Sequence, residues 1–460
     1  MQFPRAQATR TPGRPVAGIF WAGLCALIAW ALSGRVATPA AGLATAIGLL
    51  TLFVAAIVAT FSLRYMCADR QSSRFFVRLG LLVTSVLGFL FTDNLIALGA
   101  AWCASGWLLA GLIGHADGWY EASAAAARAR RAFLIGDAVL LAALGILGWQ
   151  SGSMQVGVIL PGVSQLPFFA INAAALLLVI AAAARCAVPP FSGWLLSSMT
   201  APTPVSALMH AGLVNAGGFL LIRFAPVLEA APFARAVAML LGLFGAIYGV
   251  GIMMVRPDIK RSLAGSTVSQ MGFMILSCGL GAYAAALWHL IAHGLFKAWL
   301  FLGSGSAIGM KAGKPGFELS GRASLLIAVT TLIVALSIVS ISKGNASLVP
   351  LLLGFATASA TLVAWLGGKV PMRARLTVLL ALIVLIAFHS GGLALAGMAV
   401  GRDAALIAPD WAMLVLLVVF LGAWTLQQHS VAAQRPVPLP LYVQLLNAGR
   451  LLAAPPGEQK

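Results

Sequence analysis

Long apolar stretches, separated by short polar segments, fill most of this 460-residue chain. A spanning α-helix needs ~20 mainly apolar residues. Stretches of this kind lie at about 17–34, 41–63, 79–93, 95–114, 133–150, 165–184, 203–224, 233–255, 262–280, 284–308, 323–342, 347–366, 376–400 and 410–428. The pattern predicts an all-α polytopic membrane protein with about 14 transmembrane helices. No small-residue cleavage site follows the first stretch, so we expect a retained helix and not a signal peptide.

Basic residues fall mainly on one side of the predicted bundle. If the helices alternate in direction, the opposite side holds little beyond Arg35, Arg235 and Arg402. The groups on the basic side are Arg5, Arg10 and Arg14; Arg64, Arg70, Arg74 and Arg78; Arg128, Arg130 and Arg131; Arg256, Lys260 and Arg261; Lys311, Lys314 and Arg322; Lys369, Arg373 and Arg375; and Arg435 and Arg450. The positive-inside rule then places both termini in the cytoplasm, in a multi-pass protein of the cell inner membrane.

The composition supports this interpretation and excludes other classes. Hydrophobic residues make up 61% and charged residues 9%, whereas a soluble domain is typically ~25% charged. The net charge of +18 is explained by the loop residues, and no aromatic-basic groove indicates a nucleic-acid partner. The five cysteines are scattered singly, which predicts neither a zinc site nor a disulfide framework. No nucleotide loop or catalytic triad is visible, so we expect no cofactor and no enzyme activity in this chain alone.

The tenth stretch carries three ionisable residues on one helical face. His289, His293 and Lys297 stand at i, i+4 and i+8, a spacing that rises ~12 Å along one face. Ionisable side chains are costly within a membrane and indicate function by default. The pattern therefore predicts a proton path, with structural hydrogen bonding between helices as the alternative.

Polar residues in two neighbouring stretches extend this prediction. His210 lies inside the seventh stretch, which begins with Pro202 and Pro204. Ser266, Thr267, Ser269 and Gln270 enter the ninth stretch. These residues either line a hydrated path or form hydrogen bonds between helices, and for most of the second group we favour hydrogen bonding.

Four further charged residues lie near helix breaks or inside apolar stretches. Arg185 precedes Pro189-Pro190, and Lys343 precedes Gly344-Asn345. A basic residue beside a broken helix is typical of transporters, although a side chain at the membrane boundary that reaches for water explains both equally well. Among the acidic residues, only Asp93 and Asp137 fall near or inside apolar stretches, as candidate charge partners or interfacial caps.

Three segments resemble one family of membrane subunits. APTPVSALMHAG, PDIKRSLAGSTVSQMGFM and HLIAHGLFKAWLFLGSGS are similar to the proton-conducting antiporter-like subunits of respiratory complex I and Mrp-type assemblies. The resemblance is specific from about 93 to 343. It implies two inverted five-helix repeats, each with a broken helix, joined by a central polar axis. It divides the chain into N-terminal helices (1–92), a first repeat (93–255), a second repeat (256–400), and a last helix with a cytoplasmic tail (401–460).

The resemblance also assigns residues. It implies that His210 is the family histidine after the PTPVSALxH motif, that His289, His293 and Lys297 form the linking file, and that Lys343 is the second broken-helix lysine. Two positions depart from the family. Arg185 stands where the family has lysine, and Cys103 stands where complex I subunits have a glutamate after Trp. A guanidinium stays protonated, and without the glutamate the usual charge pair is missing, so we expect the first half-channel to be closed or differently used.

Finer similarities favour one branch. HAGLVNAGGFLLIRFAPVL and PLYVQLLNAGRL resemble the membrane subunit of DAB-type inorganic carbon pumps (DabB-like), and the chain ends without the long lateral helix of the largest complex I subunit. This branch implies a large peripheral DabA-like partner, similar to a β-type carbonic anhydrase, that holds the zinc. Proton entry would then be coupled to hydration of CO2 to bicarbonate. The alternatives are an antiporter-like subunit of complex I or an Mrp antiporter, and a non-conducting membrane anchor.

Overall fold

The computed structural model describes residues 13–36, 38–304, 372–401, 410–432 and 437–450, with the single positions 329 and 333. All regular elements in these ranges are helical, and eleven of the described helices are long and apolar enough to cross a membrane. The predicted all-α polytopic class is confirmed, but the count of 14 is not. The predicted spans 323–342 and 347–366 lie outside the described residues, and the division into two repeats stays a prediction.

The N-terminal half opens with five long helices, each packed against the next. They are α1 (Gly13–Leu32), α2 (Pro39–Tyr65), α3 (Ser72–Phe91), α4 (Leu95–Ile113) and α5 (Tyr120–Ser151). Asn94 begins α4 by accepting hydrogen bonds from the backbone N–H groups of Ile96 and Ala97, as an N-cap residue does.

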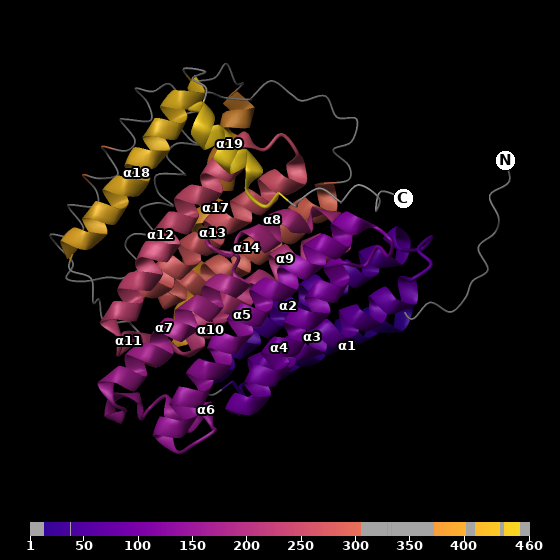
Figure 1. The fold of residues 1–460 in the computed structure, drawn as a ribbon. Helices are drawn as coiled ribbons and strands as arrows, with labels where there is room; N and C mark the ends of the chain where they lie inside the picture. Colours follow the sequence, from indigo (N-terminus) through magenta and orange to yellow (C-terminus); the bar gives the residue numbers. More distant parts are fainter. Residues whose placement is uncertain are drawn as a thin grey trace, which may run out of the picture.

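The next segment contains the predicted helix breaks. It comprises α6 (Val156–Ile159), η1 (Val163–Gln165), α7 (Phe168–Arg185), α8 (Gly193–Ser197), η2 (Ser198–Thr200), α9 (Thr203–Ala211), η3 (Leu213–Asn215), α10 (Ala216–Arg223) and α11 (Ala225–Glu229). Helix α7 ends at Arg185, and a cis Pro189-Pro190 bond lies in the turn that follows. In Figure 1, α6 and α11 lie at one end of the bundle and α8 lies at the other.

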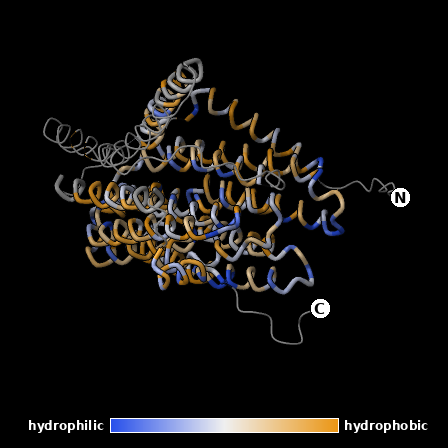
Figure 2. The backbone as a smooth tube through the Cα atoms, turned by 90° about the horizontal axis from the view of Figure 1, so that it is seen from above, coloured by the Kyte–Doolittle hydropathy of each residue, from blue (hydrophilic) through white to orange (hydrophobic). Residues whose placement is uncertain are grey.

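The remaining described helices are α12 (Pro232–Val255), α13 (Ile259–Leu280), α14 (Tyr283–Gly303), α17 (Met372–Val400), α18 (Asp410–Ala432) and the short α19 (Leu439–Asn447). Helix α14 packs against α2, α9, α13 and α17. Hydrophobic residues follow the lengths of the helices and hydrophilic residues gather mainly at turns (Figure 2), as expected for helices surrounded by lipid.

Glycines bring α12 and α13 into backbone contact. A Cβ added to Gly249 would lie 2.2 Å from the backbone nitrogen of Ser269, and one added to Gly272 would lie 2.4 Å from that of Ala246. Small residues at a helix interface allow this close approach in membranes. The pairing fixes the position of α13 and therefore of its polar residues.

Several basic residues lie inside helices and not in the loops predicted for them. Arg74 and Arg78 are in the first turns of α3, and Arg128 is in the N-terminal part of α5. The apolar pattern locates only the hydrophobic part of each helix, so it misses polar turns that continue the helix beyond that part. Arg235 was predicted at the start of the stretch 233–255, and in the structure it is buried in α12 and donates from Nε to the carbonyl of Gly279 at 2.8 Å.

The predicted orientation in the membrane stays a prediction, but Arg74, Arg78 and Arg128 lie at one end of the bundle. We call it the basic end, where α2 ends and α3, α5 and α13 begin. Hydrogen bonds also hold the described C-terminal segment at the basic end. Arg128 donates to the carbonyl of Arg450 at 3.0 Å, and Arg256 donates to the carbonyl of Ala448.

Candidate proton-translocating site

Helix α14 carries the three predicted ionisable residues into the bundle. Lys297 is fully buried and His293 is 4% exposed, whereas His289 is half-buried. The rings of His289 and His293 stack with centroids 6.0 Å apart. The predicted file on one helical face is therefore present, and it occupies the middle of α14.

His210 of α9 joins this file through its backbone and its ring. Its carbonyl oxygen lies 3.1 Å from Nε2 of His293. Its ring is buried and stacks on Phe301 with centroids 4.1 Å apart. His210 precedes His293 by 83 residues in the sequence, yet the three histidines and Lys297 form one cluster.

Helix α13 supplies the polar partners of the cluster. Nδ1 of His210 lies 3.0 Å from Oγ1 of Thr267, and Nδ1 of His293 lies 2.5 Å from Oε1 of Gln270. Of the four polar α13 residues singled out in the sequence, Thr267 and Gln270 contact the histidines. They do so by interhelical hydrogen bonds, which was the favoured interpretation for most of that group.

One member of the cluster is a backbone carbonyl, that of Leu263, which the sequence pattern does not indicate. The Leu263 carbonyl accepts from Nζ of Lys297 at 3.0 Å and from Oγ1 of Thr267 at 3.1 Å. A leucine in an apolar helix gives no indication of such a role, because the acceptor is its main chain. Leu263 O therefore links the lysine to the hydroxyl that contacts His210.

A second buried charged cluster lies in the predicted first repeat. Arg185 is 2% exposed, and its Nη2 forms an ion pair with Oδ1 of Asp137 at 3.2 Å. The guanidinium also donates to Oγ of Ser105 at 3.1 Å and to the carbonyl of Trp102 at 3.0 Å. Its Cζ lies 4.2 Å from the centre of the Trp102 ring. Arg185 is thus buried inside the bundle and does not extend from a helix end toward water.

This ion pair differs from the usual pair of the family. We expected the usual Glu–Lys pair to be missing, because Cys103 replaces the glutamate, and Asp137 was named as a possible charge partner. Cys103 instead lines an apolar hollow of about 360 Å³ with Ile96, Leu141 and Leu144. The carboxylate comes from α5, where Asp137 was predicted only as a candidate partner.

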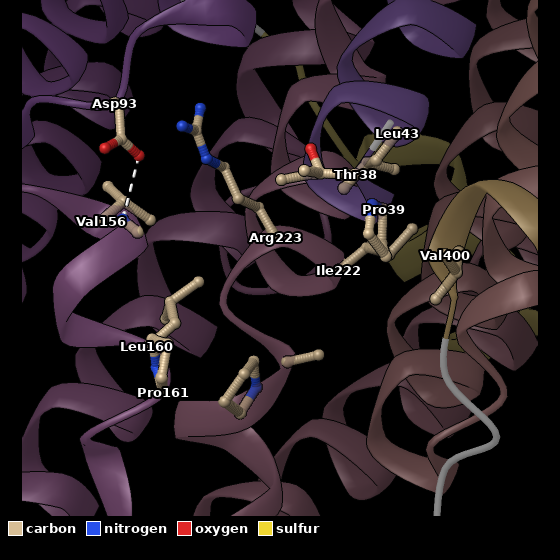
Figure 3. Close-up of a pocket in the computed structure, with 14 residues that line it drawn as sticks. Thr38, Pro39, Leu43, Asp93, Val156, Leu160, Pro161, Ile222, Arg223 and Val400 are labelled. Atoms are coloured by element: carbon tan, nitrogen blue, oxygen red, sulfur yellow. Dashed lines mark hydrogen bonds between the residues drawn. The ribbon is translucent and has the colours of Figure 1, made fainter. Parts of the chain in front are cut away.

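Asp93 belongs to neither cluster. Its Oδ1 accepts from the backbone N–H of Gly157 at 3.0 Å, so the interpretation as a cap is supported. It lines a separate pocket of about 310 Å³ together with Arg223 (Figure 3). Arg223 donates to the carbonyls of Phe89 and Leu90, both at 3.1 Å. Asp93 is therefore not a partner of Arg185, and the predicted Lys343 lies outside the described residues.

In the part of the chain that the structure describes, no group of three or more His, Cys, Asp or Glu residues could hold a metal ion. The imidazole and amine groups of the α14 cluster are groups that can bind and release protons.

Comparison with known proteins identifies the family. Residues 92–385 match the family model described as "NADH:quinone oxidoreductase/Mrp antiporter, TM", which is more than half of the chain. The chain belongs to this family. Both clusters described above, from Trp102 to Lys297, lie within the matched region.

Individual members of the family show two branches at equal similarity. The chain is 38% identical over 272 residues to the "Probable inorganic carbon transporter subunit DabB1" of Halothiobacillus neapolitanus, with 58% of this chain and 49% of that protein covered. It is 38% identical over 261 residues to "NADH-quinone oxidoreductase subunit L" of Mycobacterium tuberculosis, with 55% and 41% covered. The chain thus spans about half the length of these relatives.

A solved structure agrees with the fold. The chain is similar to a chain of the Mrp complex from Dietzia sp. DQ12-45-1b, with a TM-score of 0.62 and 25% sequence identity. The alignment covers 88% of this chain and 51% of that chain. The resemblance to antiporter-like subunits, with DabB-type subunits among the similar relatives, is confirmed.

Proposed function

We propose that this chain is the proton-translocating membrane subunit of an energy-coupled inorganic carbon pump. The observation that carries the proposal is the buried α14 cluster, in which Lys297, His293 and His210 are joined through Leu263 O and Thr267. The similarity to carbon-transporter subunits supports this branch, and the complex I branch is equally similar.

The cluster provides the parts that proton transfer through a bilayer requires. Eight residues of helix rise ~12 Å, so Lys297 and His289 bracket the central part of α14. Each of these groups binds a proton on nitrogen and passes it over hydrogen-bonding distances. Lys297 is nearer the basic end, where α14 ends, and His289 is nearer the opposite end. A proton that moves along α14 therefore passes Lys297, His293 and His289 in order or in reverse.

We assign the first-repeat cluster to a different role. The Arg185 guanidinium does not release its proton at neutral pH, and Asp137, Ser105 and Trp102 hold it in place. This cluster supports the fold and keeps the first repeat closed to protons, so flux depends on the second repeat. Lys343 is proposed to continue the path there.

The proposal includes a partner and a location. A large peripheral DabA-like subunit, similar to a β-type carbonic anhydrase, would hold the zinc and hydrate CO2, while this chain would supply the proton-motive coupling. Both termini would lie in the cytoplasm, in the cell inner membrane. The basic end then faces the cytoplasm.

Purification in mild detergent with quantification of zinc and sequencing of the partner tests the assignment. We expect a large zinc protein and bicarbonate uptake that stops when the proton gradient is dissipated. The paired substitution His293→Ala with Lys297→Ala should abolish uptake without releasing the partner. Uptake that survives both substitutions contradicts the proton-path assignment.

A second candidate is an antiporter-like subunit of complex I or of an Mrp antiporter. The equal identity to subunit L favours it, as does the TM-score of 0.62 with the Mrp complex. Quinone-reductase subunits in the purified complex, or cation-dependent proton flux without a zinc protein, would establish it. A non-conducting anchor is the third candidate, and absence of proton flux in liposomes containing the whole complex would support it.

A further inference from the structure

Hydrogen-bond polarity in the α14 cluster determines where each histidine binds its mobile proton. A carbonyl oxygen only accepts hydrogen bonds. Nε2 of His293 lies 3.1 Å from the carbonyl oxygen of His210, so Nε2 carries a hydrogen. In its neutral form His293 therefore has a bare Nδ1, and Nδ1 is the atom that gains a proton.

The partner of that atom is the amide of Gln270. The side-chain oxygen of Gln270 lies 2.5 Å from Nδ1 of His293. The amide oxygen accepts a hydrogen bond from a protonated Nδ1. When Nδ1 is unprotonated, the oxygen and the Nδ1 lone pair repel each other. A half-turn of the amide exchanges its oxygen and its nitrogen, because the two atoms occupy nearly equivalent positions. The acceptor beside Nδ1 is then replaced by a donor.

We propose that Gln270 is a positioning residue whose amide reverses when His293 gains or loses its Nδ1 proton. With neutral His293, the Gln270 NH2 group donates to Nδ1. When Nδ1 is protonated, it donates to the amide oxygen. The buried ring is then hydrogen-bonded in both states, and neither proton uptake nor release leaves an unpaired polar atom, which would cost about 1–3 kcal/mol. Gln270 is only partly buried, which leaves the amide room to turn.

His210 has the opposite tautomer, for a related reason. Oγ1 of Thr267 has one hydrogen, and it donates that hydrogen to the carbonyl of Leu263 at 3.1 Å. Thr267 must then accept from Nδ1 of His210, which lies 3.0 Å away. Nε2 of neutral His210 is left as the basic atom, and it has no hydrogen-bond partner among the described residues. The two histidines thus differ, because only His293 has a partner that reverses.

The other groups near His293 are ionisable, and none of them takes the place of the Gln270 amide at Nδ1. His289 and Lys297 share its helix, and His210 faces it from α9. Of the other helices packed on α14, α2 has no ionisable side chain before Arg64, and α10 carries only Arg223 at its far end. Helix α13 has Lys260 and Arg261 in its first turn and Cys278 near its end. Helix α17 has Arg373 and Arg375 in its first turn, and its His389 accepts from Trp288 at 2.8 Å.

The first test is spectroscopic and independent of transport. Nitrogen NMR of histidine-labelled whole complex in lipid distinguishes the two neutral tautomers and the cation, and the His293→Gln variant assigns the signal. We expect neutral wild-type His293 to carry its hydrogen on Nε2, with Nδ1 hydrogen-bonded. Gln270→Glu should convert the signal to the cation at neutral pH, because a carboxylate only accepts. Gln270→Leu should leave Nδ1 neutral and without a hydrogen bond.

The second test uses the pH profile of proton flux and rests on the proposed function. Gln270→Leu should lower flux by about fivefold to tenfold and shift its half-maximal pH downward. Gln270→Glu should lower flux and shift that pH upward. Ser277→Ala is the matched control, because Ser277 is buried on the same helix and bonds only the carbonyl of Phe273 in the described structure. It should leave the profile unchanged.

The two tests separate the inference from the proposed function. A His293 signal that neither Gln270 substitution changes overturns the inference, as do equal shifts of the pH profile in the same direction. Absence of flux in the wild-type complex overturns the proposed function, and the NMR signals still decide the inference in that case.

Discussion

Arg185 of α7 and Asp137 of α5 form an ion pair of 3.2 Å inside the helix bundle. Both side chains are almost completely buried, with 2% and 5% of each residue exposed. The pair joins two adjacent helices of the predicted first repeat at a depth where neither residue reaches water. Its consequences for stability and for proton flux are separable by mutation.

Removal of the carboxylate leaves Arg185 as an uncompensated buried charge. We expect Asp137→Asn to lower the free energy of unfolding by about 3–5 kcal/mol, measured by denaturant titration in mixed micelles. The double variant Asp137→Leu with Arg185→Met should recover most of the loss, because it buries no charge. A single variant as stable as the wild type would contradict a structural role for the pair.

Gly106 provides the space for the guanidinium. A Cβ at this position would lie 3.2 Å from Nη1 and 3.3 Å from Nη2 of Arg185. We expect Gly106→Ala to displace Arg185 from Ser105 and to destabilise the protein by about 1–3 kcal/mol. Gly145→Ala is the control on α5, since a Cβ there meets no neighbouring atom within 4 Å. Equal melting temperatures for the two variants would argue against a tight fit at Gly106.

Arg185→Lys tests whether a permanent charge closes the first repeat. An ammonium in this position still pairs with Asp137, but it releases its proton more readily than a guanidinium. In the His293→Ala, Lys297→Ala background, we expect this change to raise proton flux in liposomes by about twofold or more over the background. Flux that stays at the background level would indicate that other residues close this repeat.

Lys297 is expected to be indispensable for flux through α14. Lys297→Met removes a proton-binding group and the donor to Leu263 O, so flux should fall by about 100-fold. Lys297→Arg should not restore it, because arginine keeps its proton. Lys260→Met at the start of α13 is the control and should conduct normally. Restored flux with arginine would show that only the positive charge is needed.

The α12–α13 contact is expected to tolerate no side chain. Gly249→Ala places a methyl group 2.2 Å from the backbone of Ser269, so the helices must separate. We expect loss of folded protein or destabilisation of about 3 kcal/mol. Gly391→Ala on α17 has nothing within 4 Å and should behave as the wild type. Similar yields of the two variants after gel filtration would contradict the close contact.

Much of the fold was predictable because lipid requires it. A helix that crosses a bilayer must be apolar over its length, so the first ten predicted spans correspond to described helices. The ends of α3 and α5 were not predictable from the apolar pattern, because their polar turns, with Arg74 and Arg128, resemble loops in sequence.

The candidate site was predictable to the extent that ionisable residues mark it. The file from His289 to Lys297 was visible as a helical repeat, and the structure places its members as expected, while their role in proton transfer stays a prediction. The contact with Leu263 O was not predictable, because backbone carbonyls carry no sequence signal. The pairing of Arg185 with Asp137 joins residues from two helices, and no local spacing indicates it.

The backbone contact between α12 and α13 has a mechanical consequence. Helices held together by glycines at Gly249 and Gly272 cannot slide past each other and move as one rigid body. Their connecting turn contains Arg256, which is fastened to Ala448 of the C-terminal segment. A protein that binds at the basic end and tilts this turn would thereby reposition Gln270 and Thr267 against the histidines, without contacting either residue.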